Sequence, residues 1–304
     1  MKLSIVIPVY NTERSLVDLA SRIARVFQTR GESYEVIFVD DSSSNAATWK
    51  ILCELKESHG ARVVRLTRNF GQQPATLCGM TLATGEFIVT MDDDGQHAPE
   101  DIPLLLEFST HDAVMAELIE KRHGVLKRIA SSVKGKFDEV ILGKPKNLRL
   151  SSFRLFRRET VHGMLELMHT PFPFISAMMF YVTKDVVGVP VKHRERAEGR
   201  SGYSAAKMIA LFKNLLINQS SLLLGFIGNI GLMSSVTSVI GACYVIYRKL
   251  FLDVAIAGWT SLLVAVLLFG GLTLFSLGII GEYLIRIIGA AERRPVFLVR
   301  DDLQ

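Results

Sequence analysis

Residues 86–97 read EFIVTMDDDGQH, a short apolar run that ends in three consecutive carboxylates. The run Phe87–Met91 is typical of a buried strand in a parallel sheet. Open α/β sheets bind their ligands beyond the carboxyl ends of the strands, where this strand would deliver its acids. Because side chains alternate along an extended backbone, Asp92 and Asp94 are predicted to point one way and Asp93 another.

The acidic triplet has two interpretations. Two carboxylates that converge on one point suit Mg²⁺ or Mn²⁺, particularly where a substrate diphosphate supplies further oxygens. The alternative is a solvated acidic turn ahead of a helix that Pro99 would open. An Asp-x-Asp match is short, so this segment alone leaves both interpretations open.

Residues 1 to about 117 alternate strand-like and helix-like segments, an order that predicts an α/β fold with a mostly parallel sheet and helices on both faces. The predicted strands are Leu3–Val9, Glu35–Asp40, Arg62–Leu66, Phe87–Met91 and Ala113–Ala116. The predicted helices are Glu13–Phe27, Ala46–Ser58, Pro74–Ala83 and Pro99–Phe108. Farther along, we predict a helix over Arg157–Met168 and strands over Leu150–Phe156, Ala177–Thr183 and Val186–Val191.

The first four predicted strands all end in polar residues. The first three ends read PVYN (8–11), VDDSSS (39–44) and TRNFGQ (67–72), and the fourth is the acidic triplet. Right-handed crossovers bring these ends to one edge of the sheet, where four polar ends together predict a ligand site. Asp40 and Asp41 alone would more often cap the next helix. In this setting a carboxylate could instead accept hydrogen bonds from a nucleobase or a ribose.

Composition limits the class of protein. The 304 residues carry a formal charge of +5 and are 49% hydrophobic, with a mean hydropathy of +0.29. These values predict about two domains, one of them embedded in a membrane. A basic chain can bind nucleic acid, anionic lipid or a phosphorylated substrate, but the absence of basic runs interleaved with aromatics argues against nucleic acid. Three scattered cysteines indicate a reducing compartment.

The C-terminal third is expected to anchor the protein. The apolar segments 222–247 and 258–288 each exceed the roughly 20 residues that cross a bilayer as a helix. Residues 204–219 are expected to form an amphipathic helix in the membrane interface. The chain before the first segment and after the second is richer in basic residues than the loop between them, and no signal peptide precedes the first strand. Both termini are therefore expected in the cytoplasm.

We therefore expect a multi-pass protein of the inner (cytoplasmic) membrane, with four parts. These are a cytoplasmic catalytic domain (1–203), the interfacial helix (204–219), a two-helix anchor (220–288) and a cytoplasmic tail (289–304). A nucleotide and metal site tethered to a membrane suggests a lipid as second substrate. The most plausible reaction is transfer of a sugar from a nucleoside diphosphate onto a lipid phosphate.

The chain also resembles a known family, the polyprenyl-phosphate glycosyltransferases of glycosyltransferase family 2. This family includes the dolichyl-phosphate mannose synthase, bactoprenol glucosyltransferase and undecaprenyl-phosphate aminoarabinose transferase types. The motifs that carry the resemblance are VIPVYN (6–11), VDD (39–41), RNFG (68–71), DDDGQ (92–96), FRLFR (153–157), ER (195–196), GRS (199–201) with Tyr203, GEYLIR (281–286) and RP (294–295).

The resemblance implies a GT-A (Rossmann-like) fold and metal-dependent, inverting transfer to a polyprenyl phosphate such as undecaprenyl phosphate. It implies a uridine donor ahead of a guanosine one, a role in cell-envelope glycan modification, and a homo-oligomer such as a tetramer. The nucleotide contacts would be Pro8, Tyr10, Asn11, Glu13, Asp40, Asp41, Arg68, Gly71 and Asp93. The Mg²⁺ or Mn²⁺ ligands would be Asp92, Asp94 and Gln96, and the catalytic residues Asp92 and Asp94. The phosphate and acceptor contacts would be Arg122, Lys127, Arg128, Arg196, Ser201 and Tyr203.

Some positions depart from the family pattern. Thr12 stands where a glutamate is usual, Gly95 where an apolar residue is usual, and Gly202 where a lysine is common. Ser151 and Ser152 occupy the place of an aspartate often proposed as a base. The alternative is therefore a catalytically impaired, membrane-anchored protein that binds nucleotide sugars on the same fold. A phosphate nucleophile, however, has a second pKa of about 6 and needs no base to ionise it.

Other classes of protein fit less well. A sugar-nucleotide pyrophosphorylase would not need membrane spans, and a processive polysaccharide synthase would need more of them. A small lipid flippase would need the two expected spans to oligomerise.

Overall fold

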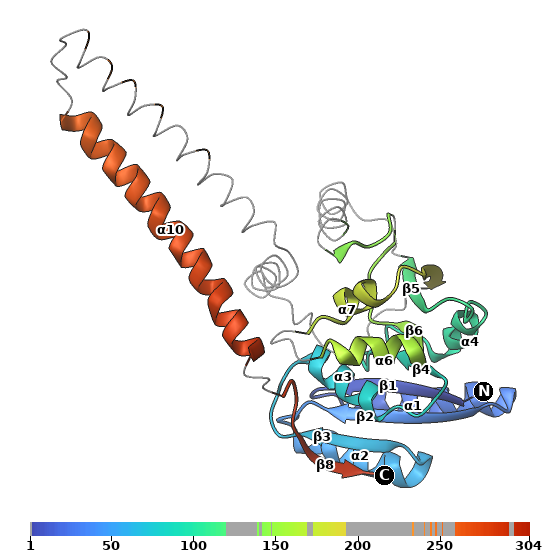
Figure 1. The fold of residues 1–304 in the computed structure, drawn as a ribbon. Helices are drawn as coiled ribbons and strands as arrows, with labels where there is room; N and C mark the ends of the chain where they lie inside the picture. The colour runs from blue at the N-terminus through green and yellow to red at the C-terminus, as the bar shows by residue number, and fades with distance from the viewer. Residues whose placement is uncertain are drawn as a thin grey trace. The chain divides into compact units, whose positions relative to one another are not determined.

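The computed structural model describes residues 2–119, 142–146, 148–168, 173–192, 259–291 and 295–304, with single positions at 139, 233, 240, 244, 247 and 251. The chain divides into two compact units (Figure 1). One unit comprises Met1–Ser204 together with Arg293–Gln304, and the other comprises Ala205–Glu292. The C-terminal residues therefore belong to the same unit as the N-terminus.

Among the described residues of the first unit, eight strands form one sheet in the order β7-β5-β6-β4-β1-β2-β3-β8. The strands are β1 (Lys2–Val9), β2 (Ser33–Asp40), β3 (Arg62–Leu66), β4 (Phe87–Thr90), β5 (Ala113–Ile119), β6 (Arg154–Arg157), β7 (Val186–Lys192) and β8 (Val299–Leu303). Neighbours β4, β1, β2 and β3 run parallel, as do β5 and β7. Strands β6 and β8 run antiparallel to their partners, so the sheet is mixed.

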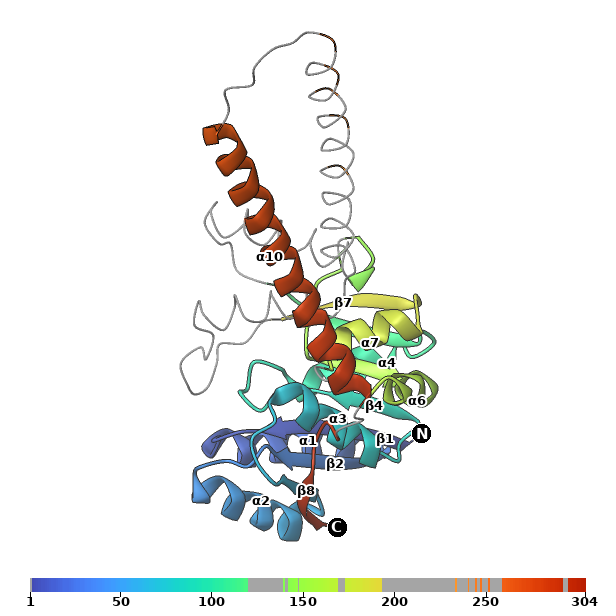
Figure 2. The ribbon, with the colours of Figure 1, turned by 60° about the vertical axis from the view of Figure 1, so that its left-hand side comes forward.

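The helices of this unit cover both faces of the sheet (Figure 2). They are α1 (Arg14–Arg30), α2 (Ala46–His59), α3 (Gln72–Leu82), η1 (Pro99–Asp101), α4 (Ile102–Leu106), α6 (Arg158–Glu166) and α7 (Ile175–Val182). On one face, the odd-numbered residues Leu3, Ile5 and Ile7 of β1 join apolar side chains of α1, α2 and α4 in the main core. On the other, α3 lies against Val6 of β1 and Val39 of β2. This alternation is what period-2 strands buried on both sides produce.

Local signals fix the ends of the first two helices. Helix α1 ends at Arg30 and is capped by Gly31, whose positive φ of 64° is easy for glycine and whose N–H donates to the Phe27 carbonyl. Helix α2 begins after Asn45, whose side chain accepts the N–H of Ala47, and ends at His59, where Gly60 with φ 63° caps it. Helix α2 thus ends one residue beyond the predicted Ser58, and α1 ends three residues beyond the predicted Phe27.

Two segments differ from the sequence-based expectations. The run Ala177–Thr183, predicted as a strand, lies mostly in helix α7, and the prediction was wrong. In helix α7, all residues from Ile175 to Phe180 are buried. An apolar run that is buried on every side shows no hydrophobic periodicity, so its sequence pattern does not distinguish a strand from a helix. Of the strand predicted over Leu150–Phe156, only the part from Arg154 onward is extended in β6.

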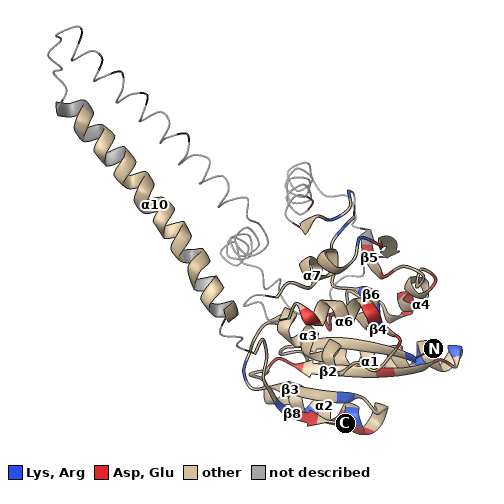
Figure 3. Ribbon diagram, in the orientation of Figure 1, with Lys and Arg blue, Asp and Glu red and all other residues tan. Residues whose placement is uncertain are grey.

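Strand β8 was missed. Its sequence, VRDDL, has little apolar character because it is the edge strand beside β3. Arg62 of β3 donates to both carboxylate oxygens of Asp302, at 3.0 and 2.6 Å. The Thr67 N–H donates to the Leu298 carbonyl at 2.9 Å. Figure 3 shows the acidic and basic residues gathered on these two strands.

The second unit contains helix α10 (Trp259–Ala291). The predicted interfacial helix lies outside the described residues, and so does the first predicted apolar segment apart from single helical positions. Within the part of the chain that the structure describes, no helix is both long and apolar enough to cross a membrane.

Candidate active site

The carboxyl ends of β1, β2 and β4 meet at one edge of the sheet. Strand pairing sets Val9 beside Asp40 and Val6 beside Thr90. The loops that follow are joined by hydrogen bonds: the Asp41 N–H donates to the Val9 carbonyl at 2.9 Å. Three of the four polar strand ends predicted to form a site are therefore adjacent here.

The first two loops contain residues in an uncommon backbone conformation. Asn11 has φ 56° and Ser42 has φ 54°, the left-handed region that costs a residue with a Cβ roughly 1–2 kcal/mol. The Asn11 N–H donates to Ser43 Oγ at 2.9 Å, and Asn11 Oδ1 accepts the Ser44 hydroxyl at 3.1 Å. Asn11, predicted to contact a nucleotide, thus ties the β1 loop to the β2 loop.

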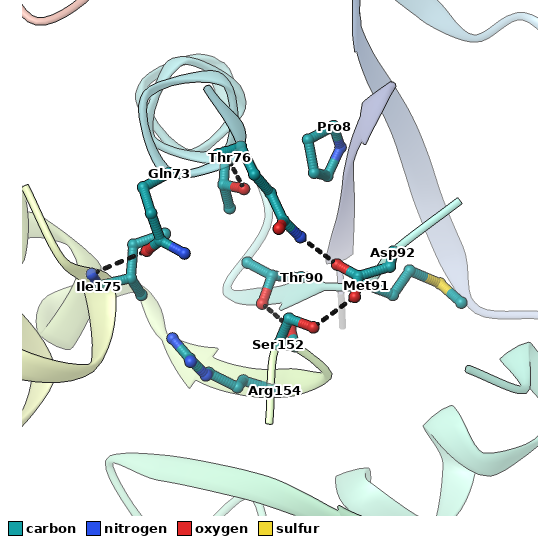
Figure 4. Close-up of a pocket in the computed structure, with 10 residues that line it drawn as sticks. Pro8, Gln73, Thr76, Thr90, Met91, Asp92, Ser152, Arg154 and Ile175 are labelled. Carbon is teal, nitrogen blue, oxygen red and sulfur yellow. Dashed lines mark hydrogen bonds between the residues drawn. The ribbon is translucent and has the colours of Figure 1, made fainter. Parts of the chain in front are cut away.

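The Asp92 carboxylate is held by donors from two other segments of the chain (Figure 4), and its backbone is held by His97 in its own loop. Gln72 Nε2 at the start of α3 donates to Asp92 Oδ1 at 2.6 Å. Ser152 Oγ, just ahead of β6, donates to Asp92 Oδ2 at 2.6 Å. The Asp92 N–H donates to Nδ1 of buried His97, whose ring stacks on Phe153 with centroids 5.2 Å apart. The carboxylate therefore has one donor on each oxygen and a fixed backbone.

The other two acids of the triplet have different surroundings. Strand β4 ends at Thr90, so strict strand alternation does not extend through residues 92–94. Asp93 Oδ2 is buried without a hydrogen-bond partner among the described residues. Burial, together with the negative charges of Asp92 and Asp94, raises the pKa of Asp93 to about 6. Asp94 Oδ1 accepts the Gln96 N–H at 3.0 Å, which fixes the turn.

The expectation for Asp40 needs correction. Its side chain is fully buried, its Oδ1 accepts the Ser43 N–H at 2.9 Å, and its Oδ2 lies 3.2 Å from Arg65 Nε. The Arg65 N–H is not directed at that oxygen, so the contact is an ion pair rather than a hydrogen bond. A carboxylate enclosed in this way has no surface left for a nucleotide. Asp40 stabilises the end of β2 instead.

Asp41 organises the third strand end. Its two carboxylate oxygens accept the N–H groups of Phe70 at 2.7 Å and Gly71 at 2.8 Å. Burial raises the pKa of Asp41, and these hydrogen bonds oppose the rise. Gly71 has φ 98°, which favours glycine, and precedes α3. The exposed Arg68 guanidinium lies over the Phe70 ring at 4.2 Å.

A small pocket lies beside Asp92 (Figure 4). It is lined by Pro8, Gln72, Gln73, Thr76, Thr90, Met91, Asp92, Ser152, Arg154 and Ile175. The lining is mainly hydroxyls, amides and one cation. Such groups suit a polar, oxygen-rich ligand.

The cation of this pocket is Arg154, which sequence reasoning did not single out. It is 5% exposed; its Nη2 donates to Ser176 Oγ at 2.8 Å and its Nε donates to the Ser151 carbonyl. Burial lowers the pKa of Arg154 to about 10, and the charge of Asp92 opposes this. The side chain thus stays charged at neutral pH. The sequence feature that could have identified Arg154 is its position between two apolar residues of a predicted strand, where a charged residue is unusual.

The remaining predicted site residues are less informative. Tyr10 is 48% exposed at the rim of the β1 loop, and Glu13 accepts a hydrogen bond from the Asn45 side-chain amide. The predicted phosphate and acceptor contacts all lie outside the described residues; these are Arg122, Lys127, Arg128, Arg196, Ser201 and Tyr203.

A mixed α/β sheet with acidic residues beyond a central parallel strand is the arrangement of a fold of the GT-A type. The model of the family described as Glycosyl transferase family 2 matches residues 4–165, more than half of the chain. The chain belongs to this family and is a glycosyltransferase.

Two curated relatives extend the match to nearly the whole chain. Undecaprenyl-phosphate 4-deoxy-4-formamido-L-arabinose transferase of Klebsiella pneumoniae strain 342 is 31% identical over 308 residues, covering 98% of this chain and 93% of the relative. The protein of the same name from Sodalis glossinidius strain morsitans is 30% identical, with the same coverage. The resemblance to polyprenyl-phosphate glycosyltransferases is thereby confirmed.

A solved structure supports the fold alone. Glucosyl-3-phosphoglycerate synthase from Mycobacterium tuberculosis, in complex with Mn²⁺, uridine diphosphate and glucosyl-3-phosphoglycerate, aligns with a TM-score of 0.50 at 16% identity. The alignment covers 71% of this chain and 77% of that one.

Proposed function

We propose that this glycosyltransferase moves a sugar from a nucleoside diphosphate, with uridine favoured, onto a polyprenyl phosphate such as undecaprenyl phosphate. The observation that carries the proposal is the Asp92 carboxylate, fixed at the carboxyl edge of the sheet beside a polar pocket. The acceptor class is supported by relatives that match 98% of the chain and are named for undecaprenyl phosphate.

The acidic triplet fits a divalent cation, Mg²⁺ or Mn²⁺. Asp92 and Asp94 supply hard carboxylate oxygens, and each Asp92 oxygen accepts one hydrogen bond and retains a further lone pair. The mutual repulsion that contributes to the raised pKa of Asp93 is what a nearby cation would relieve. Across the described residues, no three His, Cys, Asp or Glu side chains group to hold a metal by themselves.

The donor diphosphate would complete such a site, with the Gln96 side chain as a further ligand. A metal bound there would stabilise the charge of the departing nucleoside diphosphate. The part of this chain is then to hold Asp92 and Asp94 in place and to frame the nucleotide with the loops after β1, β2 and β3.

The reaction we propose is a single in-line displacement at the anomeric carbon, with inversion. The nucleophile is an oxygen of the lipid phosphate. This phosphomonoester is largely ionised near neutral pH, since the second pKa of such a group is about 6. The enzyme therefore needs to align two anions rather than to remove a proton. Ser152 suits this chemistry because its hydroxyl donates to Asp92 and does not act as a base. The fixed charge of Arg154 adds positive potential beside the pocket.

A polyprenyl phosphate acceptor requires the site to lie at a membrane. We place residues 1–203 in the cytoplasm, residues 204–219 in the interface and the anchor over 220–288. The basic residues outside the described ranges, Arg122, Lys127, Arg128 and Arg196, would meet the acceptor phosphate at the membrane surface. We also propose that the protein forms a homo-oligomer such as a tetramer.

The test uses full-length protein in detergent with undecaprenyl phosphate, Mg²⁺ or Mn²⁺, and a panel of radiolabelled nucleotide sugars. We expect one donor to move its label into the organic phase, with loss of transfer in Asp94→Ala and an inverted anomeric centre in the product. A retained configuration would refute the single displacement. If no donor transfers label while a nucleotide still binds with metal, the protein is the impaired binding protein and the proposal fails.

A further inference from the structure

We propose that Gln72 and Ser152 are positioning residues that set the orientation of the Asp92 carboxylate toward the metal and the donor diphosphate. The inference rests on the proposed function, because it assumes that Asp92 is a metal ligand. It assigns a task to two side chains whose hydrogen-bond donors are directed at the Asp92 carboxylate.

The two contacts restrict the carboxylate on both sides. Gln72 Nε2 reaches Oδ1 and Ser152 Oγ reaches Oδ2, each at 2.6 Å. The Ser152 distance is typical of a hydroxyl that donates to an ionised acceptor. With a donor on each oxygen, rotation of the carboxylate about its Cβ–Cγ bond would break both bonds at once. The lone pairs that remain are therefore presented in one fixed direction.

Each donor is itself held in place by a neighbour. The Ser152 carbonyl accepts the Thr90 hydroxyl at 2.8 Å, which ties it to the end of β4. The main-chain carbonyl of Gln72 accepts a hydrogen bond from the hydroxyl of Thr76, one turn along α3, at 2.9 Å. Asp41 fixes Gly71, the residue before Gln72, by its backbone N–H. The network thus connects the ends of β2 and β4 with the start of α3 through Asp92.

The chemistry of the donors also matters. A hydroxyl and a primary amide are neutral, so they orient Asp92 without cancelling the negative charge that would bind a cation. An aspartate at position 152 would instead set two carboxylates side by side, and these would repel one another. Partners of this kind commonly change metal affinity or activity by about 10- to 100-fold when they are removed.

Ser151 provides a matched control. Its hydroxyl accepts the Phe153 N–H at 3.1 Å, whereas the hydroxyl of the adjacent Ser152 contacts Asp92. Ser151→Ala and Ser152→Ala remove the same atom at neighbouring positions. Ser152→Thr keeps the hydroxyl, and Gln72→Met keeps the length of the side chain but removes the donor.

The experiment titrates Mn²⁺ into each full-length variant and measures binding of UDP by calorimetry, or of GDP if the transfer assay selects a guanosine donor. Transfer at each metal concentration is measured in parallel, with melting temperatures to verify folding. We expect Ser152→Ala and Gln72→Met to need about 10- to 100-fold more Mn²⁺ in both assays. Ser151→Ala and Ser152→Thr should stay within a few-fold of the parent.

Two results overturn the inference: Ser152→Ala that matches Ser151→Ala in the Mn²⁺ titration, or Ser152→Thr that fails to restore it. Asp92→Asn separates this failure from that of the proposed function. If Asp92→Asn abolishes metal-dependent binding while Ser152→Ala does not, only the positioning role is refuted. If Asp92→Asn leaves binding and transfer unchanged, the proposed metal site itself is wrong.

Discussion

Gly79→Ala should destabilise the α/β unit, although alanine is the better helix former. Gly79 lies inside α3, in the run Ala75–Met80, whose residues are all buried. A Cβ at this position would lie 2.3 Å from Val6 Cγ1 and 3.2 Å from Val39 Cγ2. The first distance is far inside van der Waals contact, so the helix or the strand must move.

The magnitude follows from two opposing effects. Replacing glycine by alanine in a helix interior gains about 1 kcal/mol of propensity. Overpacking a filled core costs typically about 1–3 kcal/mol, and the upper part of that range applies because Val6 is fully buried and β-branched. We therefore expect a net loss of about 1–2 kcal/mol, which lowers the melting temperature of a unit of this size by about 2–4 °C per kcal/mol.

A double-mutant cycle measured by thermal unfolding of the full-length protein checks this reasoning. Val6→Ala alone should be destabilising, because it leaves a cavity. In the Gly79→Ala background the same change removes the clashing methyl group, so the double variant should be more stable than additivity predicts, by about 1 kcal/mol or more. A melting temperature that rises in Gly79→Ala, or strict additivity of the two changes, would refute the close packing of α3 on the sheet.

The remaining predictions concern the edge strand, a strained turn and the buried cation. Asp302→Asn should cost about 1 kcal/mol of unfolding free energy, while Asp301→Asn, which loses only an exposed pair, should cost less. Arg62 holds the pKa of Asp302 below its usual value. The ion pair therefore stabilises the folded protein fully above the unfolded-state pKa of an aspartate, about 3.9. This stabilisation is lost as the pH falls through the lower pKa that Asp302 has in the folded protein. The deficit should therefore stay constant between about pH 5 and 8 in chemical denaturation, and a slope there would contradict it. Ser42→Gly should raise the melting temperature slightly, since it relieves a left-handed backbone that costs about 1–2 kcal/mol and loses some chain entropy in return; a lower melting temperature would speak against strain at φ 54°. Arg154→Met should lower kcat of transfer by about 10²-fold, as loss of a preorganised charge does, and an unchanged kcat would remove this residue from the site.

The parallel half of the sheet could be predicted because its signals are local. The apolar runs of β1, β2 and β3 are bounded by turn residues, and the structure places their ends within two residues of the prediction. Strand β8 could not be predicted in the same way. Its pairing with β3 depends on backbone hydrogen bonds and on Arg62 and Asp302, 240 positions apart, and no local pattern in VRDDL records this.

In the candidate site, too, local features could be predicted from the sequence, whereas contacts between distant residues could not. That the strand ends carry polar residues is visible in the sequence, but the partner of each residue depends on the register between strands. Asp40 and Arg65 are directly opposite in the pairing of β2 with β3, which turns a predicted ligand contact into a buried ion pair. Asp41, one residue beyond the strand, is free of that pairing and binds the loop before α3.

Ser152 shows how much a residue's role depends on such distant partners. In the sequence, Ser151 and Ser152 occupy the place of a family aspartate, which favours the alternative of a catalytically impaired protein. In the fold, its hydroxyl lies 2.6 Å from Asp92, an acid 60 residues away, and completes the pair of donors begun by Gln72. A phosphate acceptor needs no base, so the position can supply a hydrogen-bond donor without a chemical penalty. The departure from the family pattern is therefore compatible with an active site built around an oriented Asp92.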